Sequence, residues 1–151
     1  KFGLLGNVAV MAPEQLGEIP EASLDLIFVN SVLQYLSRAD LDGLLATWRR
    51  LLKPGGQLLI ADVIPPNVGL LTDVAALLKL SAQNGFLIAS CFGLVRIFFS
   101  DYRKARTALG LAHYSEAEML ATLSAAGYDA RRRAQNFGHN PARMAFVGRF
   151  K

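Results

Sequence analysis

The sequence predicts one α/β domain on an open, doubly wound sheet that is parallel in its middle and ends in an antiparallel β-hairpin. The chain has 151 residues, about the length of one domain. Between residues 24 and 63, an apolar run, an amphipathic segment, a Pro-Gly-Gly turn and a second apolar run follow one another. This order is typical of a right-handed parallel βαβ unit. Near the C-terminus, two short β-prone runs flank a brief polar loop, which favours a hairpin.

Apolar runs define the predicted strands. Leu24–Val29 is apolar apart from Asp25, and Leu58–Val63 is almost as apolar. Such runs are typical of central strands that are covered on both faces. The hairpin is predicted from Tyr128–Asn136 and Met144–Phe150, because these β-prone segments are separated by a Gly- and Pro-containing turn.

Capping signals define two of the predicted helices. Ser37 and Asp40 approximate a capping box, and leucines then recur at helical spacing until the Pro-Gly-Gly turn at 54–56. Ser115 and Glu118 form a second capping box, which starts a helix that ends before the next glycine. We therefore expect one helix between the two parallel strands and another before the hairpin.

A helical insertion is expected at about residues 67–110, with its helices at about 68–106. Val68–Gln83 has an apolar side at helical spacing. Phe86–Phe99 is apolar almost throughout, yet it is shorter than the ~20 residues of a membrane span and contains an arginine. No transmembrane segment is therefore predicted.

Composition narrows the class of protein. Hydrophobic residues make up 52% and charged residues 19%, which excludes a disordered chain. The formal net charge of +4 is mild and does not by itself indicate nucleic acid. A single cysteine excludes an internal disulfide framework or a Cys-based zinc site, so we expect no metal centre and a reducing, cytoplasmic location.

Three stretches of the sequence, in order, resemble class I S-adenosylmethionine-dependent methyltransferases. The first, Leu24–Leu36, reads LDLIFVNSVLQYL and is similar to the fourth strand and following loop of that family. The second reads RRLLKPGG from Arg49 and leads into a strand that ends at Asp62. The third, Tyr114–Tyr128, is similar to the last helix and sixth strand of the family. The resemblance covers most of the chain except residues 68–110.

The resemblance implies a Rossmann-like fold with S-adenosylmethionine as cofactor and S-adenosylhomocysteine as product. It also implies that residues 1–151 are the C-terminal part of one methyltransferase domain. The Gly-rich cofactor loop of the family is not found, because Gly3 to Gly6 is no GxGxG and follows no strand. An ordinary domain of this class would need about 100 residues more upstream.

Six residues are candidates for contact with the cofactor. Ligands of open α/β sheets bind beyond the carboxyl ends of the strands, where Asn30 and Ser31 follow the first strand. The alternative is a turn that only joins strand to helix. By resemblance, Gln34 and Tyr35 line the cofactor or acceptor pocket. The candidates are Met11, Ala12, Asn30, Ser31, Gln34 and Tyr35.

Met11 and Ala12 are candidates by position alone. They match the place where the family commonly has an acidic residue that hydrogen-bonds the adenine amino group. Here the sequence reads Met-Ala-Pro-Glu, so Glu14 or backbone groups would have to replace that contact. A plain strand-end role for Met11 is the alternative.

The acceptor side has weaker candidates. Asp62 ends the second strand and either contacts substrate or caps the following turn. Histidine titrates near neutrality, so His113 and His139 could act in acid–base chemistry, as could Tyr114, although solvated loop histidines are common. No catalytic residue is assigned beyond the weak candidates His139 and Tyr35, since methyl transfer can proceed by positioning alone. The substrate candidates are Asp62, Phe98, His113 and Tyr114.

The predicted function is methyl transfer to an O, N or C nucleophile of a small molecule by direct in-line displacement. The apolar helix at 86–99 would form a lid over an apolar acceptor or a homodimer face, with an extra core helix as the alternative. No nucleic-acid partner is expected, because Arg131, Arg132 and Arg133 alternate faces along a strand. The competing interpretation is a non-catalytic Rossmann-like dimerisation or binding module, or a truncated inactive fragment. A nicotinamide dehydrogenase is disfavoured by the missing dinucleotide fingerprint.

Overall fold

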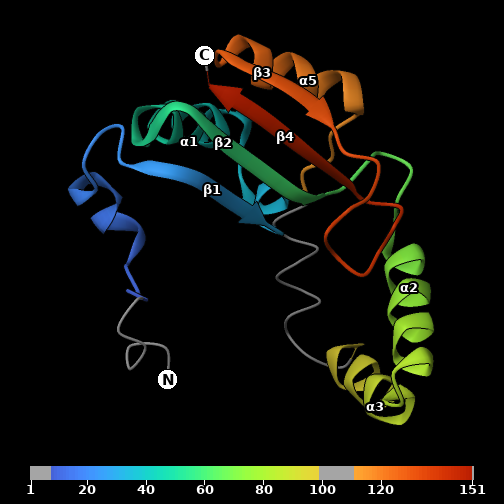
Figure 1. The fold of residues 1–151 in the computed structure, drawn as a ribbon. Coiled ribbons are helices and arrows are strands. Elements are labelled where there is room, and N and C mark those ends of the chain that lie inside the picture. Colours follow the sequence, from blue (N-terminus) through green and yellow to red (C-terminus); the bar gives the residue numbers. More distant parts are fainter. Residues whose placement is uncertain (1–7, 99–110, 151) are drawn as a thin grey trace.

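The sheet has four strands in the order β1-β2-β4-β3 (Figure 1). A computed structural model describes residues 8–98 and 111–150. The strands are β1 (Leu24–Asn30), β2 (Leu52–Val63), β3 (Tyr128–Arg132) and β4 (Met144–Phe150). β1 and β2 are parallel, whereas β4 runs antiparallel to both β2 and β3. The predicted α/β class, with its parallel pair and terminal hairpin, is confirmed.

Six helical segments accompany the sheet among the described residues. They are η2 (Pro13–Glu18), η3 (Leu33–Tyr35), α1 (Arg38–Leu51), α2 (Leu70–Gln83), α3 (Leu87–Phe98) and α5 (Glu116–Ala125). Both predicted capping boxes are present. The Ser37 hydroxyl accepts from the Asp40 backbone N–H at 3.1 Å, and the Ser115 hydroxyl accepts from that of Glu118 at 3.2 Å. These caps satisfy N–H groups that the first turn of each helix leaves without a partner.

β2 begins earlier than the sequence predicts. The helix α1 ends at Leu51, and the strand includes the Pro-Gly-Gly segment. At Gly56 a Cβ would lie 2.8 Å from the Lys53 carbonyl oxygen, so a larger residue would not fit there without a backbone shift. The Pro-Gly-Gly segment is thus an irregular stretch within β2: Gly55 has φ +78°, and the pairing with β1 shifts from Leu24↔Leu52 to Leu26↔Gln57.

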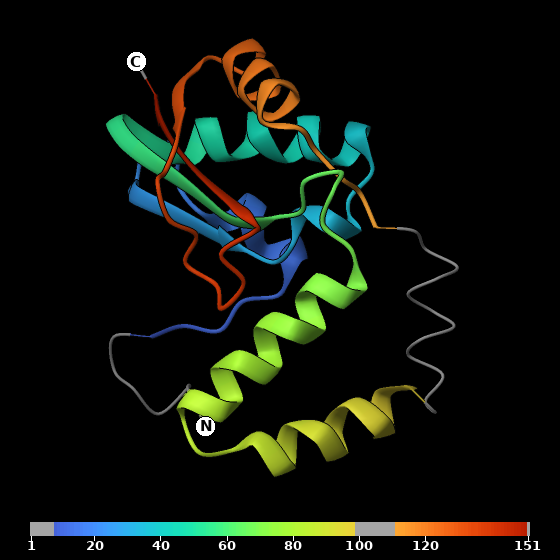
Figure 2. The same cartoon turned by 90° about the vertical axis from the view of Figure 1, so that its right-hand side faces the viewer.

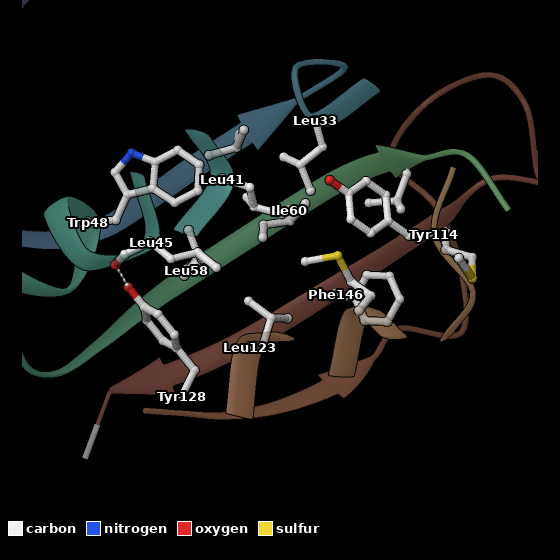
Figure 3. Close-up of a cluster of buried hydrophobic side chains, with 14 of the residues drawn as sticks. Leu33, Leu41, Leu45, Trp48, Leu58, Ile60, Tyr114, Leu123, Tyr128 and Phe146 are labelled. Atoms are coloured by element: carbon white, nitrogen blue, oxygen red, sulfur yellow. Dashed lines mark hydrogen bonds between the residues drawn. The ribbon is translucent and has the colours of Figure 1, made fainter. Parts of the chain in front are cut away.

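The helices α1 and α5 cover one face of the sheet and enclose the core (Figures 1 and 3). Leu45 and Trp48 of α1 face Leu58 of β2, and Leu123 of α5 completes the layer. Tyr128 extends beneath α1, where its hydroxyl donates a 3.2 Å hydrogen bond to the Leu45 carbonyl oxygen. Burial of these apolar side chains supplies the main stabilisation of the domain.

The opposite face of the sheet is open in the part of the chain that the structure describes. Leu26 and Phe28 of β1 are each 52% exposed, and Phe28 meets Phe137 edge to face at 5.4 Å between ring centroids. The prediction that Leu24–Val29 is covered on both faces is therefore wrong for these residues. An apolar strand sequence indicates what a face can bury, but it does not specify which segment covers it.

The arginines at the end of β3 and directly after it, Arg131, Arg132 and Arg133, alternate between the two faces as predicted. Arg132 lies on the side of α5 and donates to Glu116 at 2.7 Å. Arg131 and Arg133 line a shallow cavity of about 300 Å³ on the open face, together with Arg149 of β4. The three consecutive arginines therefore do not form one continuous basic surface.

Helices are confirmed within the predicted insertion up to Phe98, where α2 and α3 form a hairpin that extends away from α1 and α5 (Figure 2); the rest of the predicted insertion, residues 99–110, lies outside the described residues. Large apolar side chains on it are exposed, among them Leu71 at 84%, Ile88 at 75% and Phe92 at 73%. The alternative of an extra core helix is not supported, because no described side chain of α3 is buried. In the described ranges, no helix is long and apolar enough to cross a membrane.

Candidate functional site

The carboxyl ends of β1 and β2 lie side by side and have an unusual backbone. Ser31, directly after β1, has φ +58°, and Asp62, near the end of β2, has φ +66°. Left-handed conformations are uncommon for residues other than glycine, and they concentrate at functional sites. The Ser31 hydroxyl donates to Asp62 Oδ2 at 2.7 Å, so the two strained residues support each other.

A buried arginine completes this corner of the molecule. Arg143 precedes β4 and is 8% exposed. Its Nη1 donates to Asp62 Oδ2 at 2.6 Å and to Gln34 Oε1 at 3.3 Å. Its Nε and Nη2 donate to the two carboxylate oxygens of Asp73 in α2, at 3.0 and 2.7 Å. Burial alone would lower the pKa of Arg143, but the bonds to Asp73 and the charges of both carboxylates raise it above its ordinary value.

The loop between β3 and β4 holds both aspartates from the other side. The Asn136 side chain accepts from the Asp62 backbone N–H at 3.0 Å and donates to Asp62 Oδ1 at 3.1 Å. Asn140 Nδ2 donates to Asp73 Oδ1 at 2.7 Å. Gly138 allows the close approach, because a Cβ there would lie 2.7 Å from Asp62 Oδ1.

We call this group of side chains the strand-end cluster. It consists of Ser31, Gln34, Asp62, Asp73, Asn136, Asn140 and Arg143. Two carboxylates face one guanidinium, so its formal charge is −1. Buried charges persist when they are paired and hydrogen-bonded, as they are here.

Three of the predicted site residues meet in the strand-end cluster. Ser31 and Asp62 are hydrogen-bonded to each other, and Gln34 reaches them through Arg143. Asn30 and Tyr35 lie next to this cluster in the chain, and both side chains are exposed. The alternative of a turn-capping role for Asp62 describes part of its environment, since its backbone N–H is bonded to Asn136.

Other predicted residues lie apart from the strand-end cluster. Met11 and Ala12 are exposed. The backbone N–H of Ala12 donates to Gln15 Oε1 at 2.8 Å. His113 is exposed, and its carbonyl oxygen accepts from Arg38 at 3.0 Å. The side chain of Phe98 lies outside the described residues.

Tyr114 is placed in the core rather than at the surface. It is 0% exposed, with the Arg38 guanidinium 3.7 Å from its ring centroid. Its hydroxyl has no hydrogen-bond partner among the described residues. Burial raises the pKa of Tyr114, although the charge of Arg38 opposes this effect.

His139 borders a cavity of about 400 Å³ between α2 and the β3–β4 loop. Lys79 and Gln83 of α2 line its other side, and Asn136 belongs to both this cavity and the strand-end cluster. His139 therefore lines the same cavity as Asn136, a residue of the strand-end cluster.

Four residues of the strand-end cluster were not predicted from the sequence: Asp73, Asn136, Asn140 and Arg143. Asp73 carries a signal in hindsight, because it is the only acidic residue in a largely apolar helix. Arg143 directly precedes a strand whose first residues are buried. Neither signal identifies the partner, which lies 70 positions away in the chain.

Comparisons with known proteins agree with the fold. Residues 3–60 match the family model described as a methyltransferase domain. None of the curated proteins matches the sequence. Among solved structures, human N-acetylserotonin methyltransferase in complex with S-adenosylmethionine is 17% identical with a TM-score of 0.52, and the match covers 87% of this chain and 30% of that one.

Two further structures share the fold to a similar degree. An O-methyltransferase family protein from Burkholderia thailandensis is 16% identical with a TM-score of 0.54, covering 90% of this chain and 33% of that one. PigF with S-adenosylhomocysteine is 20% identical with a TM-score of 0.54, covering 89% and 32%. The chain thus spans about a third of the length of these proteins. The family match and the shared fold confirm the resemblance predicted from the sequence.

Proposed function

We propose that this chain, which resembles the class I S-adenosylmethionine-dependent methyltransferases in sequence and fold, belongs to an enzyme that methylates a small molecule. The observation that carries the proposal is the strained strand-end pair Ser31 and Asp62 at the carboxyl edge of two parallel strands. Open α/β sheets bind their ligands at this edge. The family match, which ends at residue 60 within β2, includes the first of these strand ends.

The residues at this edge fit a polar, zwitterionic cofactor. When bound, S-adenosylmethionine would supply an electrophilic methyl carbon: the acceptor nucleophile would form its new bond to that carbon in line with the breaking C–S bond, whose electron pair would leave on the sulfur of S-adenosylhomocysteine. Asn30 offers an exposed carboxamide. Gln34 is held in place at this edge by two hydrogen bonds. Its carboxamide oxygen accepts from Arg143, and its backbone oxygen accepts from Ala112 N–H.

The proposed adenine contacts come from the residues directly before η2. Met11 is 43% exposed and can cover an aromatic ring with its thioether. Glu14 lies in the first turn of η2 and is the nearest acidic residue in the sequence to the position where the family has one. We propose Met11 and Ala12 as adenine contacts on this basis.

For an acceptor that loses a proton on methylation, His139 is the candidate general base. An imidazole can accept a proton near neutral pH, and His139 borders the 400 Å³ cavity beside the strand-end cluster. Tyr35, with 53% exposure, is the second candidate at the same edge. Acceptors that carry an ionised or uncharged lone-pair nucleophile would need only positioning by these residues.

The hairpin of α2 and α3 is proposed to cover an apolar acceptor. Leu71, Ile88 and Phe92 are strongly exposed, which is unusual for large apolar side chains of a soluble domain. The alternative is that residues 86–99 form a homodimer interface through the same surface. Dimer dissociation on Phe92→Asp without a change in acceptor KM would favour the dimer, and a raised KM at an unchanged mass would favour the lid.

The proposal is tested by titrating S-adenosylhomocysteine into the complete natural protein by calorimetry. We expect one saturable site whose affinity falls at least about fivefold, or about 1 kcal/mol, in Asn30→Ala. Asn84→Ala, an exposed asparagine at the far end of α2, should leave the affinity unchanged. A complete protein that binds neither S-adenosylhomocysteine nor S-adenosylmethionine would contradict the proposal and favour a non-catalytic binding module. The cytoplasmic location of the enzyme stays a prediction.

A further inference from the structure

Arg143 uses all three nitrogens of its guanidinium on carboxylates from two different elements. Nη1 donates to Asp62 of β2 at 2.6 Å, while Nε and Nη2 form a bidentate pair with Asp73 of α2. The side chains of Arg143 and Asp62 are each 9% exposed, and that of Asp73 is 16% exposed. Water therefore screens these charges weakly, and a paired arrangement in this environment is strongly favoured over a broken one.

The helix α2 has few other ties to the domain. Ser81 is its one buried residue, and the Ser81 hydroxyl donates within the helix, to the Leu78 carbonyl oxygen. Among the hydrogen bonds of the described ranges, those that join an α2 side chain to the rest of the domain all end on Asp73. Asp73 thus carries the described side-chain hydrogen bonds between the domain and the hairpin, whose direction is visible in Figure 2.

We propose that Arg143 is a positioning residue that fixes the α2–α3 hairpin relative to the carboxyl ends of β1 and β2. Arg143 connects to Ser31 through Asp62 and directly to Gln34, so the hairpin and the ligand-binding edge share one rigid link. The statement that this link places an acceptor against the cofactor rests on the proposed function. The existence of the link rests only on the hydrogen bonds of Arg143.

The geometry requires arginine rather than any cation. A guanidinium is planar and presents several donors in a fixed fork, so it can satisfy two carboxylates on different sides. A lysine ammonium is a compact charge and cannot reproduce both the bidentate pair with Asp73 and the bond to Asp62. Arg143→Lys should therefore release the hairpin while the charge at this position is retained.

The experiment measures the spread of distances between the hairpin and α1 by electron–electron double resonance. Cys91 is exposed on α3 and takes one spin label, with any cysteine of the complete protein outside residues 1–151 replaced by serine. A second label is placed on the exposed face of α1 through Ala46→Cys. We expect a narrow distance distribution in the parent protein and one about twofold broader, or more, in Arg143→Lys.

Two further variants keep the measurement decisive. Asp73→Asn removes the partner charge and should broaden the distribution as Arg143→Lys does, with little further change when the two are combined, because both break the same link. Arg132→Lys, which alters an exposed pair with Glu116, should leave the distribution narrow. Unchanged widths in both Arg143→Lys and Asp73→Asn would overturn the proposal, as would equal broadening in Arg132→Lys.

The binding of S-adenosylhomocysteine separates this inference from the proposed function. Arg143 also bonds Asp62 and Gln34 at the proposed cofactor edge, so Arg143→Lys should weaken the binding of S-adenosylhomocysteine by the complete protein as well as broaden the distance distribution. An unchanged affinity alongside a broadened distribution would contradict the shared link between the hairpin and the ligand-binding edge. If the parent protein does not bind this probe, the proposed function fails, and the label distances still decide whether Arg143 fixes the hairpin.

Discussion

Ser31 and Asp62 end neighbouring parallel strands, both have left-handed backbone, and the Ser31 hydroxyl donates a 2.7 Å hydrogen bond to the Asp62 carboxylate. Each conformation costs free energy on its own, and their pairing persists because Arg143 and Asn136 hold Asp62 from other directions. The strain is thus located where an α/β sheet binds its ligand.

Asp62→Asn should destabilise the domain strongly. Asparagine tolerates a left-handed backbone, so the substitution mainly removes the charge that Arg143 faces at 2.6 Å. Breaking a buried ion pair in this way costs about 3 kcal/mol in the free energy of unfolding, measured by urea denaturation. The matched control is Asp25→Asn, whose partner Lys53 is exposed, and it should cost less than about 1 kcal/mol. Similar losses for the two variants would show that the Asp62 pair is not special.

Gly138→Ala should destabilise the domain, while Gly43→Ala should stabilise it. At Gly138 the new Cβ would lie 2.7 Å from Asp62 Oδ1 and 3.0 Å from Asn136 Nδ2. At Gly43, inside the exposed side of α1, no atom lies within 4 Å of the new Cβ. Alanine in a helix interior stabilises the folded state by about 0.5–1 kcal/mol relative to glycine. Thermal unfolding of the two variants gives the sign directly, and a neutral Gly138→Ala would contradict the close packing against Asp62.

Local signals were enough to predict most of the fold. The capping residues Ser37 and Ser115 act within one turn of their helices, so the sequence around them contains the whole interaction. Ser31, Gln34 and Asp62 were predicted for the site because strand ends can be located from apolar runs. Arg143 was not predicted, because its meaning depends on Asp73, which no periodicity connects to it. The exposure of Phe28 was also missed, since strand composition does not reveal which face has a cover.

Removal of the hydroxyl group should destabilise the domain at Tyr128 but not at Tyr114. Tyr128 donates to the Leu45 carbonyl oxygen, so Tyr128→Phe should cost about 1 kcal/mol in the free energy of unfolding. The Tyr114 hydroxyl is buried without a partner in the described part of the chain, so Tyr114→Phe should be neutral or stabilising. Chemical denaturation of both variants tests this, and an equal loss in both would mean that Tyr114 also has a bonding partner.

Tyr128 also gives the domain a defined weakness at alkaline pH. Burial raises the pKa of Tyr128 to about 12, from 10.0 in a solvated tyrosine. Between these values the unfolded chain loses the phenolic proton and the folded chain keeps it, so the stability that Tyr128 contributes decreases as pH rises from 10 towards 12. In Tyr128→Phe the free energy of unfolding should decrease less between pH 10 and pH 12 than in the parent protein. The same pH dependence in the variant would contradict this assignment.

The central claim, that the carboxyl ends of β1 and β2 hold the cofactor, is tested most directly by nuclear magnetic resonance. Backbone amide shifts of the complete protein are followed while S-adenosylhomocysteine is added. We expect saturable shifts concentrated at residues 30–35 and around Asp62, with little change in α5. Saturable shifts confined to another surface, such as the open face around Arg131 and Arg149, or no shifts at all, would contradict it.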